Sequence, residues 1–157
     1  MSKFQLKFFF KAAYDLMLVF LQFFIISLHF FQWEFLPQKQ IIEASPFSYF
    51  LGILIIIIAF IIMLVSIKDL GRNLSPFPRP INNSNLVTTG IYRFARHPMY
   101  YSLILISFGV FIIKLSFYYL FLLISLTLII IFKIALEEKY LKNKFKNYLL
   151  YKNEVKV

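Results

Sequence analysis

Residues 115–136 read LSFYYLFLLISLTLIIIFKIAL, and Lys133 is the one charged residue among them. A helix needs about 20 apolar residues to cross a hydrocarbon core about 30 Å thick. This run is long enough, and it ends abruptly, because Glu137 and Glu138 follow at once. The run therefore predicts a helix that spans a membrane.

Three further apolar segments precede this run, and the four predicted spans are residues 12–31, 47–67, 99–113 and 115–136. The composition agrees, because 61% of the residues are hydrophobic, against about 45–50% in soluble domains. Lys114 alone separates the third and fourth segments, which predicts a tight helical hairpin. We predict an all-α integral membrane protein of about four transmembrane helices, with residues 1–157 forming a single membrane-embedded domain.

The basic residues, which give a net charge of +10, are distributed asymmetrically. They gather near the N-terminus, between residues 68 and 98, and from residue 133 onward, whereas residues 33–46 contain one lysine and two glutamates. By the positive-inside rule, both termini and the 68–98 loop lie in the cytoplasm. Topology explains this charge better than nucleic-acid binding, because the basic residues flank apolar runs.

Cysteine is absent, and His29 and His97 are the two histidines. These counts exclude disulfides, thiolate metal sites and a histidine-rich metal cluster. Asp15 and His29 fall near the two ends of the first predicted span, and we interpret both as interfacial residues. We expect membrane lipids as partners, and neither a nucleic acid nor a metal.

The stretch LVTTGIYRFARHPMYY, residues 86–101, is polar and basic although long apolar runs lie on both sides. Pro98 suits the first turn of the third helix. A helix N-terminus there directs free N–H groups and a positive dipole toward an anionic group, and Arg93 and Arg96 add positive charge. Helix capping with membrane anchoring explains the stretch about as well as a binding site does.

Glu137 and Glu138 end the fourth span, at a depth where carboxylates are costly unless they are paired. The predicted topology places this acidic pair and the basic stretch on the same side of the membrane. Together they suit a zwitterionic or cationic ligand such as S-adenosylmethionine, which offers a ribose diol, a carboxylate and a sulfonium. A phosphorylated nucleotide would also suit the arginines.

Residues 90–100, GIYRFARHPMY, resemble the G-x-Y-x-x-x-R-H-P-x-Y signature of the isoprenylcysteine carboxyl methyltransferase and phospholipid methyltransferase superfamily. Residues 70–73 (LGRN), 86–89 (LVTT) and 137–141 (EEKYL) resemble its flanking elements, so the likeness covers residues 66–151. The resemblance implies S-adenosylmethionine in a cytoplasm-facing pocket and a lipophilic substrate that arrives through the bilayer.

The same resemblance assigns residues to the pocket. Arg96, His97, Pro98 and Tyr100 match the cofactor-binding motif, Glu137 and Glu138 match its acidic half, and Gly90 and Tyr92 would shape the loop around the cofactor. Sequence reasoning identifies no nucleophile–base pair, and Arg96 and Glu138 are the candidates for a catalytic role. The chain departs from the pattern at Tyr101-Ser102, where family members usually have a glycine, and at its C-terminus, where the usual arginine and proline are missing. Lys152 and Lys156 are candidates to replace that arginine as a cation.

The resulting hypothesis is S-adenosylmethionine-dependent methyl transfer to a lipophilic acceptor. The favoured acceptor is the carboxylate of a prenylated cysteine-like substrate, which is already ionised near neutral pH and needs no catalytic base. Three alternatives stay open at this point: a phospholipid N-methyltransferase, an NADPH-dependent isoprenoid or sterol reductase-like protein, and a non-catalytic membrane accessory protein.

Overall fold

The computed structural model describes residues 3–31 and 40–156, and helices dominate these parts of the chain. The elements are α1 (Lys3–Leu28), α2 (Pro46–Leu70), the 3-10 turns η1 (Gly71–Asn73) and η2 (Gly90–Arg93), α3 (Pro98–Lys114), α4 (Phe117–Lys144) and α5 (Tyr148–Glu154). No strand occurs among the described residues, and the prediction of an all-helical chain is confirmed for them.

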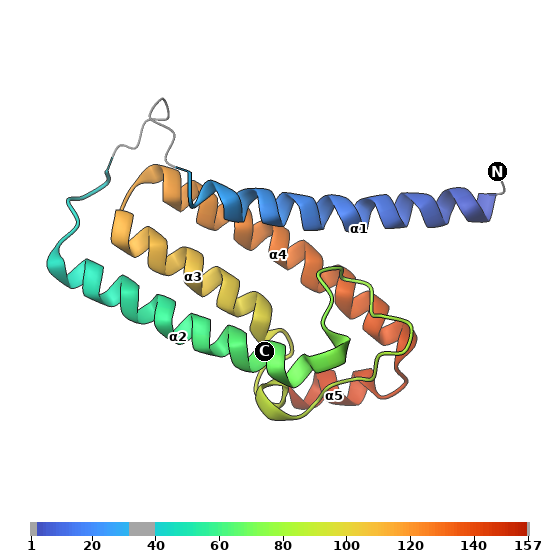
Figure 1. The fold of residues 1–157 in the computed structure, drawn as a ribbon. Coiled ribbons are helices and arrows are strands. Elements are labelled where there is room, and N and C mark those ends of the chain that lie inside the picture. Colours follow the sequence, from blue (N-terminus) through green and yellow to red (C-terminus); the bar gives the residue numbers. More distant parts are fainter. Residues whose placement is uncertain (1–2, 32–39, 157) are drawn as a thin grey trace.

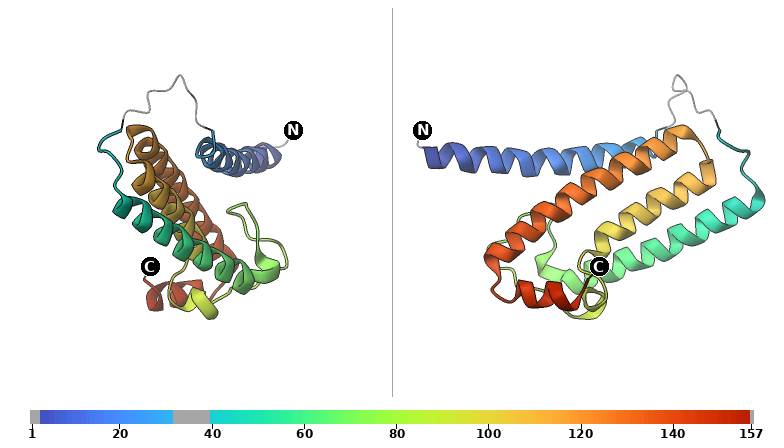
Figure 2. Two further views of the ribbon diagram at one scale, coloured as in Figure 1. Left: turned by 60° about the vertical axis from the view of Figure 1, so that its left-hand side comes forward. Right: turned by 180° about the vertical axis from the view of Figure 1, so that it is seen from behind.

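The helices form a small bundle whose elements meet at one end (Figure 1). α3 packs against both α2 and α4, while α1 packs along α4 and diverges from the other helices toward its N-terminus (Figures 1 and 2). The last turns of α2 and α4, the first turn of α3 and the short α5 gather at the same end. Four segments that are far apart in the sequence therefore surround one region.

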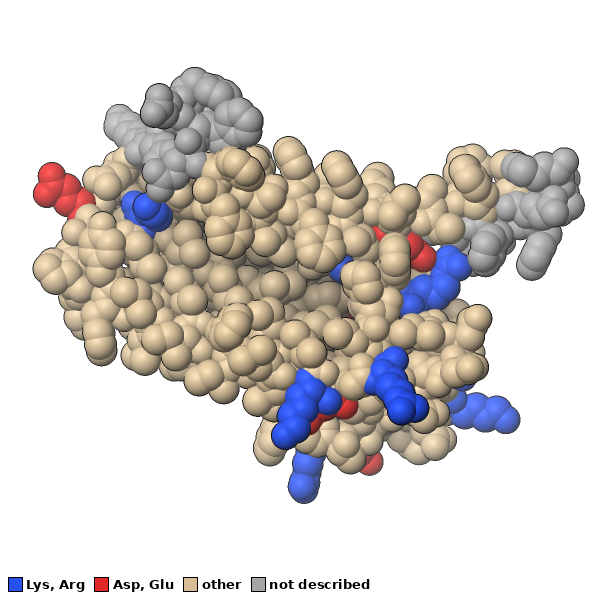
Figure 3. Space-filling view, viewed as in Figure 1, with Lys and Arg blue, Asp and Glu red and all other residues tan. Residues whose placement is uncertain are grey.

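Two of the described helical segments are long and apolar enough to cross a membrane, namely Pro46–Asn73 and Phe117–Lys144. They contain the second predicted span and all of the fourth except its first two residues, Leu115 and Ser116. The apolar helices Ala12–Leu28 and Pro98–Lys114 are shorter, so a total of four spans stays a prediction. In Figure 3 the surface along the helices carries few charged side chains, whereas lysines and arginines gather at the end where α5 lies.

The connection between α3 and α4 differs from the predicted one in a detail. Lys114 is the last residue of α3, and Leu115 and Ser116 form the link. Leu115 adopts a left-handed conformation with φ 42°, and its N–H donates to the carbonyl of Phe111. Its own carbonyl accepts from Ile41 N–H, which joins the turn to the start of the 40–45 segment. At the other end of α3, Pro98 occupies the first helical turn, as the sequence predicted.

The interface of α2 and α3 depends on two glycines that allow the backbones to approach closely. A Cβ atom on Gly52 would lie 2.7 Å from the carbonyl oxygen of Gly109, and one on Gly109 would lie 2.9 Å from that of Gly52. Both distances are below ordinary carbon–oxygen contact. This close packing holds α3 against α2 at the end of their interface that lies away from Arg96, His97 and Pro98, here called the RHP segment.

The interpretation of Asp15 and His29 as interfacial residues misses their contacts. His29 Nε2 lies 2.8 Å from Ser107 Oγ and therefore joins the end of α1 to α3. Asp15 is buried, and its carboxylate forms an ion pair with Arg79, 64 residues further along the chain. Apolar periodicity cannot reveal such pairs, because each partner lies in a different segment.

Replacing Gly52 with alanine is expected to destabilise the protein by about 1–3 kcal/mol, because the new methyl group overpacks the helix interface. The midpoint of thermal unfolding in detergent, followed by circular dichroism, measures the effect. Ile53→Ala is the control, since Ile53 is half exposed on the same helix. Equal midpoints for the two variants would contradict the close approach.

Candidate functional site

The segment that leads into α3 is shaped by Gly90, which has φ 62°. A Cβ atom there would lie 2.0 Å from Asp69 Oδ2, so both the backbone conformation and the available space require glycine. The same Asp69 oxygen accepts a hydrogen bond from Ile91 N–H at 2.8 Å. Asp69 thus fixes η2 against the end of α2, a role that the sequence analysis did not assign.

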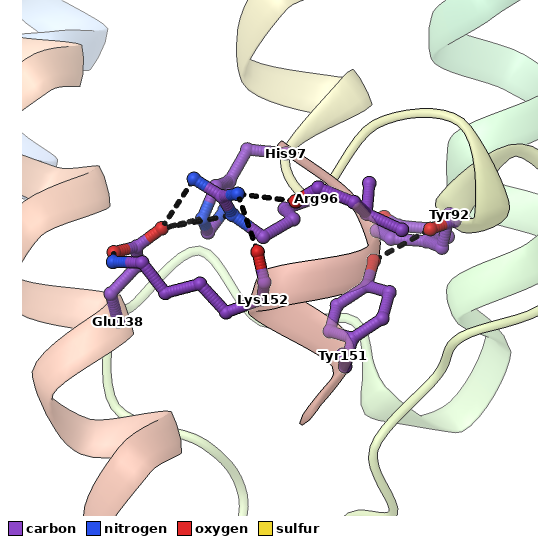
Figure 4. Close-up of polar contacts among 7 residues, drawn as sticks. Tyr92, Arg96, His97, Glu138, Tyr151 and Lys152 are labelled. Carbon is purple, nitrogen blue, oxygen red and sulfur yellow. Dashed lines mark hydrogen bonds and ion pairs between the residues drawn. The ribbon is translucent and has the colours of Figure 1, made fainter. Parts of the chain in front are cut away.

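Tyr92 lies in η2, and its side chain is buried. The hydroxyl of Tyr151, on α5, donates to the carbonyl of Tyr92 at 2.6 Å (Figure 4). The Tyr92 hydroxyl points toward α2, where the carbonyl of Ser66 lies 3.5 Å away. The aromatic pair therefore connects η2 to both the C-terminal helix and α2.

A cavity with a water-accessible volume of about 80 Å³ lies where these segments meet. Its walls come from the end of α2, the loop of residues 74–89, the start of α3, the end of α4 and α5. Five of the residues assigned from the sequence line it, namely Tyr92, Arg96, His97, Tyr100 and Glu137. The other three, Gly90, Pro98 and Glu138, are not among the lining residues.

Glu138 is instead the centre of an ionic cluster (Figure 4). Its Oε1 accepts from Arg96 Nε at 3.1 Å and lies 3.1 Å from Arg96 Nη2. Its other oxygen accepts from the ammonium of Lys152. His97 Nε2 lies 3.6 Å from Oε1. One carboxylate on α4 therefore holds the RHP segment and α5 together.

The other side of the Arg96 guanidinium faces the C-terminus. Nη1 donates to the carbonyl of Val155 and lies 3.5 Å from that of Lys152. Arg96 is thus bound by a carboxylate and by backbone carbonyls at the same time. An anionic ligand that used Arg96 would compete with these partners for the guanidinium.

Glu137 has a different position, because successive residues of an α-helix point about 100° apart. Its carboxylate lines the cavity on the same side as Tyr100, which also lines it. Lys133, one turn earlier on α4, places its ammonium 5.1 Å from the Tyr100 ring centroid. Of the two adjacent glutamates, Glu137 is therefore the one that a ligand in the cavity would meet.

His97 is almost completely buried and stacks on Tyr100 with a centroid separation of 5.9 Å. Burial lowers the pKa of His97 to about 4, although the nearby Glu138 carboxylate acts in the opposite direction. The imidazole is therefore neutral at physiological pH. It can donate a hydrogen bond or accept one, but it adds no charge to the cavity.

The phospholipid methyltransferase family model matches residues 47–148, about two thirds of the chain. The chain belongs to this family. Neither a curated protein nor a solved structure matches it. Family membership implies methyltransferase activity, and together with the apolar helices α2 and α4 it indicates a membrane protein.

The matched region contains the whole cavity wall except α5's later turns, and α1 lies entirely outside it. Within this family match, the sequence had singled out the RHP segment and the glutamate pair, which the structure brings to one place. Sequence reasoning missed Asp69, the loop residues that line the cavity, and the pairing of Arg79 with Asp15. The one signal that pointed to Lys152 was the departure at the C-terminus.

The neutral state of His97 makes stability depend on pH. An unfolded histidine titrates near pH 6.5, whereas the native one does so near 4. Between these values the unfolded chain binds an extra proton, so stability falls as the pH is lowered, by up to about 3 kcal/mol. Thermal unfolding at stepwise pH should show a smaller loss in His97→Gln than in the parent protein; parallel curves would refute the assignment.

Proposed function

We propose that this chain catalyses S-adenosylmethionine-dependent methyl transfer to a lipid acceptor. The observation that carries the proposal is the cavity in which Glu137, Tyr100 and the RHP segment meet, in a chain of the phospholipid methyltransferase family. The cavity opens at the end of apolar helices, where a lipid headgroup and a cytoplasmic cofactor have access to the same region.

The residues present suit this cofactor. Glu137 would accept hydrogen bonds from the ribose hydroxyls, and the aromatic residues Tyr92 and Tyr148, which line the cavity, would stabilise the positive sulfonium. When bound, S-adenosylmethionine supplies an electrophilic methyl group.

The protein's own contribution would be orientation and exclusion of water. Positioning two bound reactants lowers a barrier by about 7–11 kcal/mol, and the buried walls of the cavity limit hydration of the acceptor. For an amine acceptor, which must lose a proton, Glu137 is the carboxylate placed to take it. A carboxylate acceptor would need no such base.

Two acceptor chemistries therefore follow from the same site. The carboxylate of a prenylated cysteine-like compound is the acceptor that the sequence motif favours. The amine of a phospholipid headgroup is favoured by the family description and by Glu137, since a carboxylate in the cavity attracts a protonated amine. The arginines of the wall, Arg79 and Arg96, already pair with Asp15 and Glu138.

Both termini and the cavity are proposed to face the cytoplasm, with the α2 N-terminus on the opposite side. The absence of cysteine allows single-cysteine variants to report on this topology. In intact cells, a membrane-impermeant maleimide should label Ser45→Cys, and it should label Asn83→Cys only after permeabilisation. Both positions are exposed. The reverse pattern would overturn the orientation.

Calorimetric titration of the detergent-purified protein with S-adenosylhomocysteine, and in parallel with NADPH, tests the cofactor. Saturable binding of the first alone is expected. Glu137→Gln should weaken that affinity about 10-fold or more, because a charged hydrogen-bond partner is lost. The control Glu154→Gln, which changes an exposed glutamate of α5, should bind normally.

The alternatives give distinct results in the same titration. Binding of NADPH alone would indicate a reductase, and binding of neither compound would indicate an accessory protein. If S-adenosylhomocysteine binds, transfer of a labelled methyl group to phosphatidylethanolamine or to a farnesylated cysteine analogue decides between the acceptors. Methyl transfer to neither compound would refute the lipid acceptor proposed above.

A further inference from the structure

α1 lies outside the region that the family model matches, yet two of its buried polar side chains reach the cavity wall. The part of the wall that they meet is residues 74–81, here called the roof segment. Ser75, Phe77, Pro78, Arg79 and Pro80 of this segment line the cavity. Pro78 is fully buried, whereas Leu74, Phe77 and Ile81 of the roof segment are each about 40% exposed.

The first contact joins Asp15 to Arg79. Asp15 is only 4% exposed, and its Oδ2 lies 3.0 Å from Arg79 Nη2. Its other oxygen accepts a hydrogen bond from the Tyr140 hydroxyl at 3.2 Å. The Arg79 guanidinium lies 5.4 Å from the Tyr140 ring centroid. α1, the roof segment and the end of α4 therefore meet at one buried carboxylate.

The second contact runs through Lys133, which is 1% exposed. Its ammonium donates to the side-chain oxygen of Gln22 on α1 and to the carbonyl of Pro76 in the roof segment, the latter at 3.0 Å. The same ammonium lies over the ring of Tyr100 on the cavity wall. One buried cation thus joins α1, the roof segment and Tyr100 on the cavity wall.

These contacts are polar and lie where little water competes for them. A buried charge that loses its partner strongly destabilises the folded protein. Asp15 and Lys133 are therefore expected to keep their partners in the native state. At its far end, the roof segment is anchored separately by Lys144, which donates to the carbonyls of Ile81 and Asn82. The contacts with α1 and Lys133 therefore hold the part of the roof segment between Pro76 and Arg79, which borders the cavity.

We propose that Asp15, Gln22 and Lys133 are positioning residues that hold the roof segment over the cavity, so that α1 is required for tight ligand binding. The identity of the ligand rests on the function proposed above, whereas the placement of the roof does not. None of the three residues touches the cavity directly, and each acts through Arg79, Pro76 or Tyr100.

Labelling of a single cysteine measures the position of the roof without reference to any ligand. Ser75→Cys places a thiol on the roof segment, where the native side chain is partly buried in the cavity wall, and the chain has no other cysteine. In the purified protein, its reaction with a maleimide should be slow. Adding Gln22→Met or Asp15→Asn should accelerate it about 10-fold, because each removes a contact with α1.

Conservative variants separate positioning from general stability. Gln22→Glu keeps an acceptor for Lys133, and Asp15→Glu keeps the charge for Arg79, so both should keep labelling slow. Ser27→Ala is the control on α1, since its hydroxyl bonds within the helix to the carbonyl of Phe24. The accelerated variants should also bind S-adenosylhomocysteine about 10-fold more weakly.

The outcomes distinguish this inference from the proposed function. Accelerated labelling in a protein that binds no S-adenosylhomocysteine would support the role of α1 and refute the cofactor. Tight binding with equal labelling rates in all variants would refute the role of α1 and leave the cofactor intact. Equal acceleration by the conservative and disruptive variants would also overturn the proposal, because it would indicate nonspecific loosening.

Discussion

The carboxylate of Glu138 is the interaction on which the site depends. It accepts from Arg96 just before α3 and from Lys152 on α5, and it lies beside His97. Glu138 itself is on α4, so one side chain joins three segments that are up to 56 residues apart. Charges this poorly solvated are stable only when they are paired. The cluster therefore closes one side of the cavity and keeps α5 in place.

The neighbouring glutamate follows from the same helix geometry. Because residues 137 and 138 point about 100° apart, one carboxylate faces the cavity while the other faces α5. A dipeptide that looks like a single acidic motif thus divides into a ligand-facing residue and an organising residue. The contacts of α1 extend this arrangement, since Lys133, one turn before Glu137, holds the roof segment and Gln22.

The sequence predicted the parts of this fold that local patterns determine. Apolar runs predicted the long helices, Pro98 predicted the start of α3, and the polar stretch before it indicated the site. It could not predict that Arg96 would bind Glu138, because residue types alone do not specify which opposite charges meet. Asp15 was interpreted as interfacial for the same reason, since its partner Arg79 lies 64 residues away. The close contact between Gly90 and Asp69 likewise arises only after folding.

The central claim is that Arg96 and Glu138 stabilise the protein as a coupled pair rather than separately. A double-mutant cycle with Arg96→Gln, Glu138→Gln and the combined variant, measured as unfolding free energy in detergent, tests it most directly. The account predicts a coupling energy of about 0.5–3 kcal/mol, because the two side chains contact each other directly and are mostly buried. Additive effects, with no coupling, would contradict it.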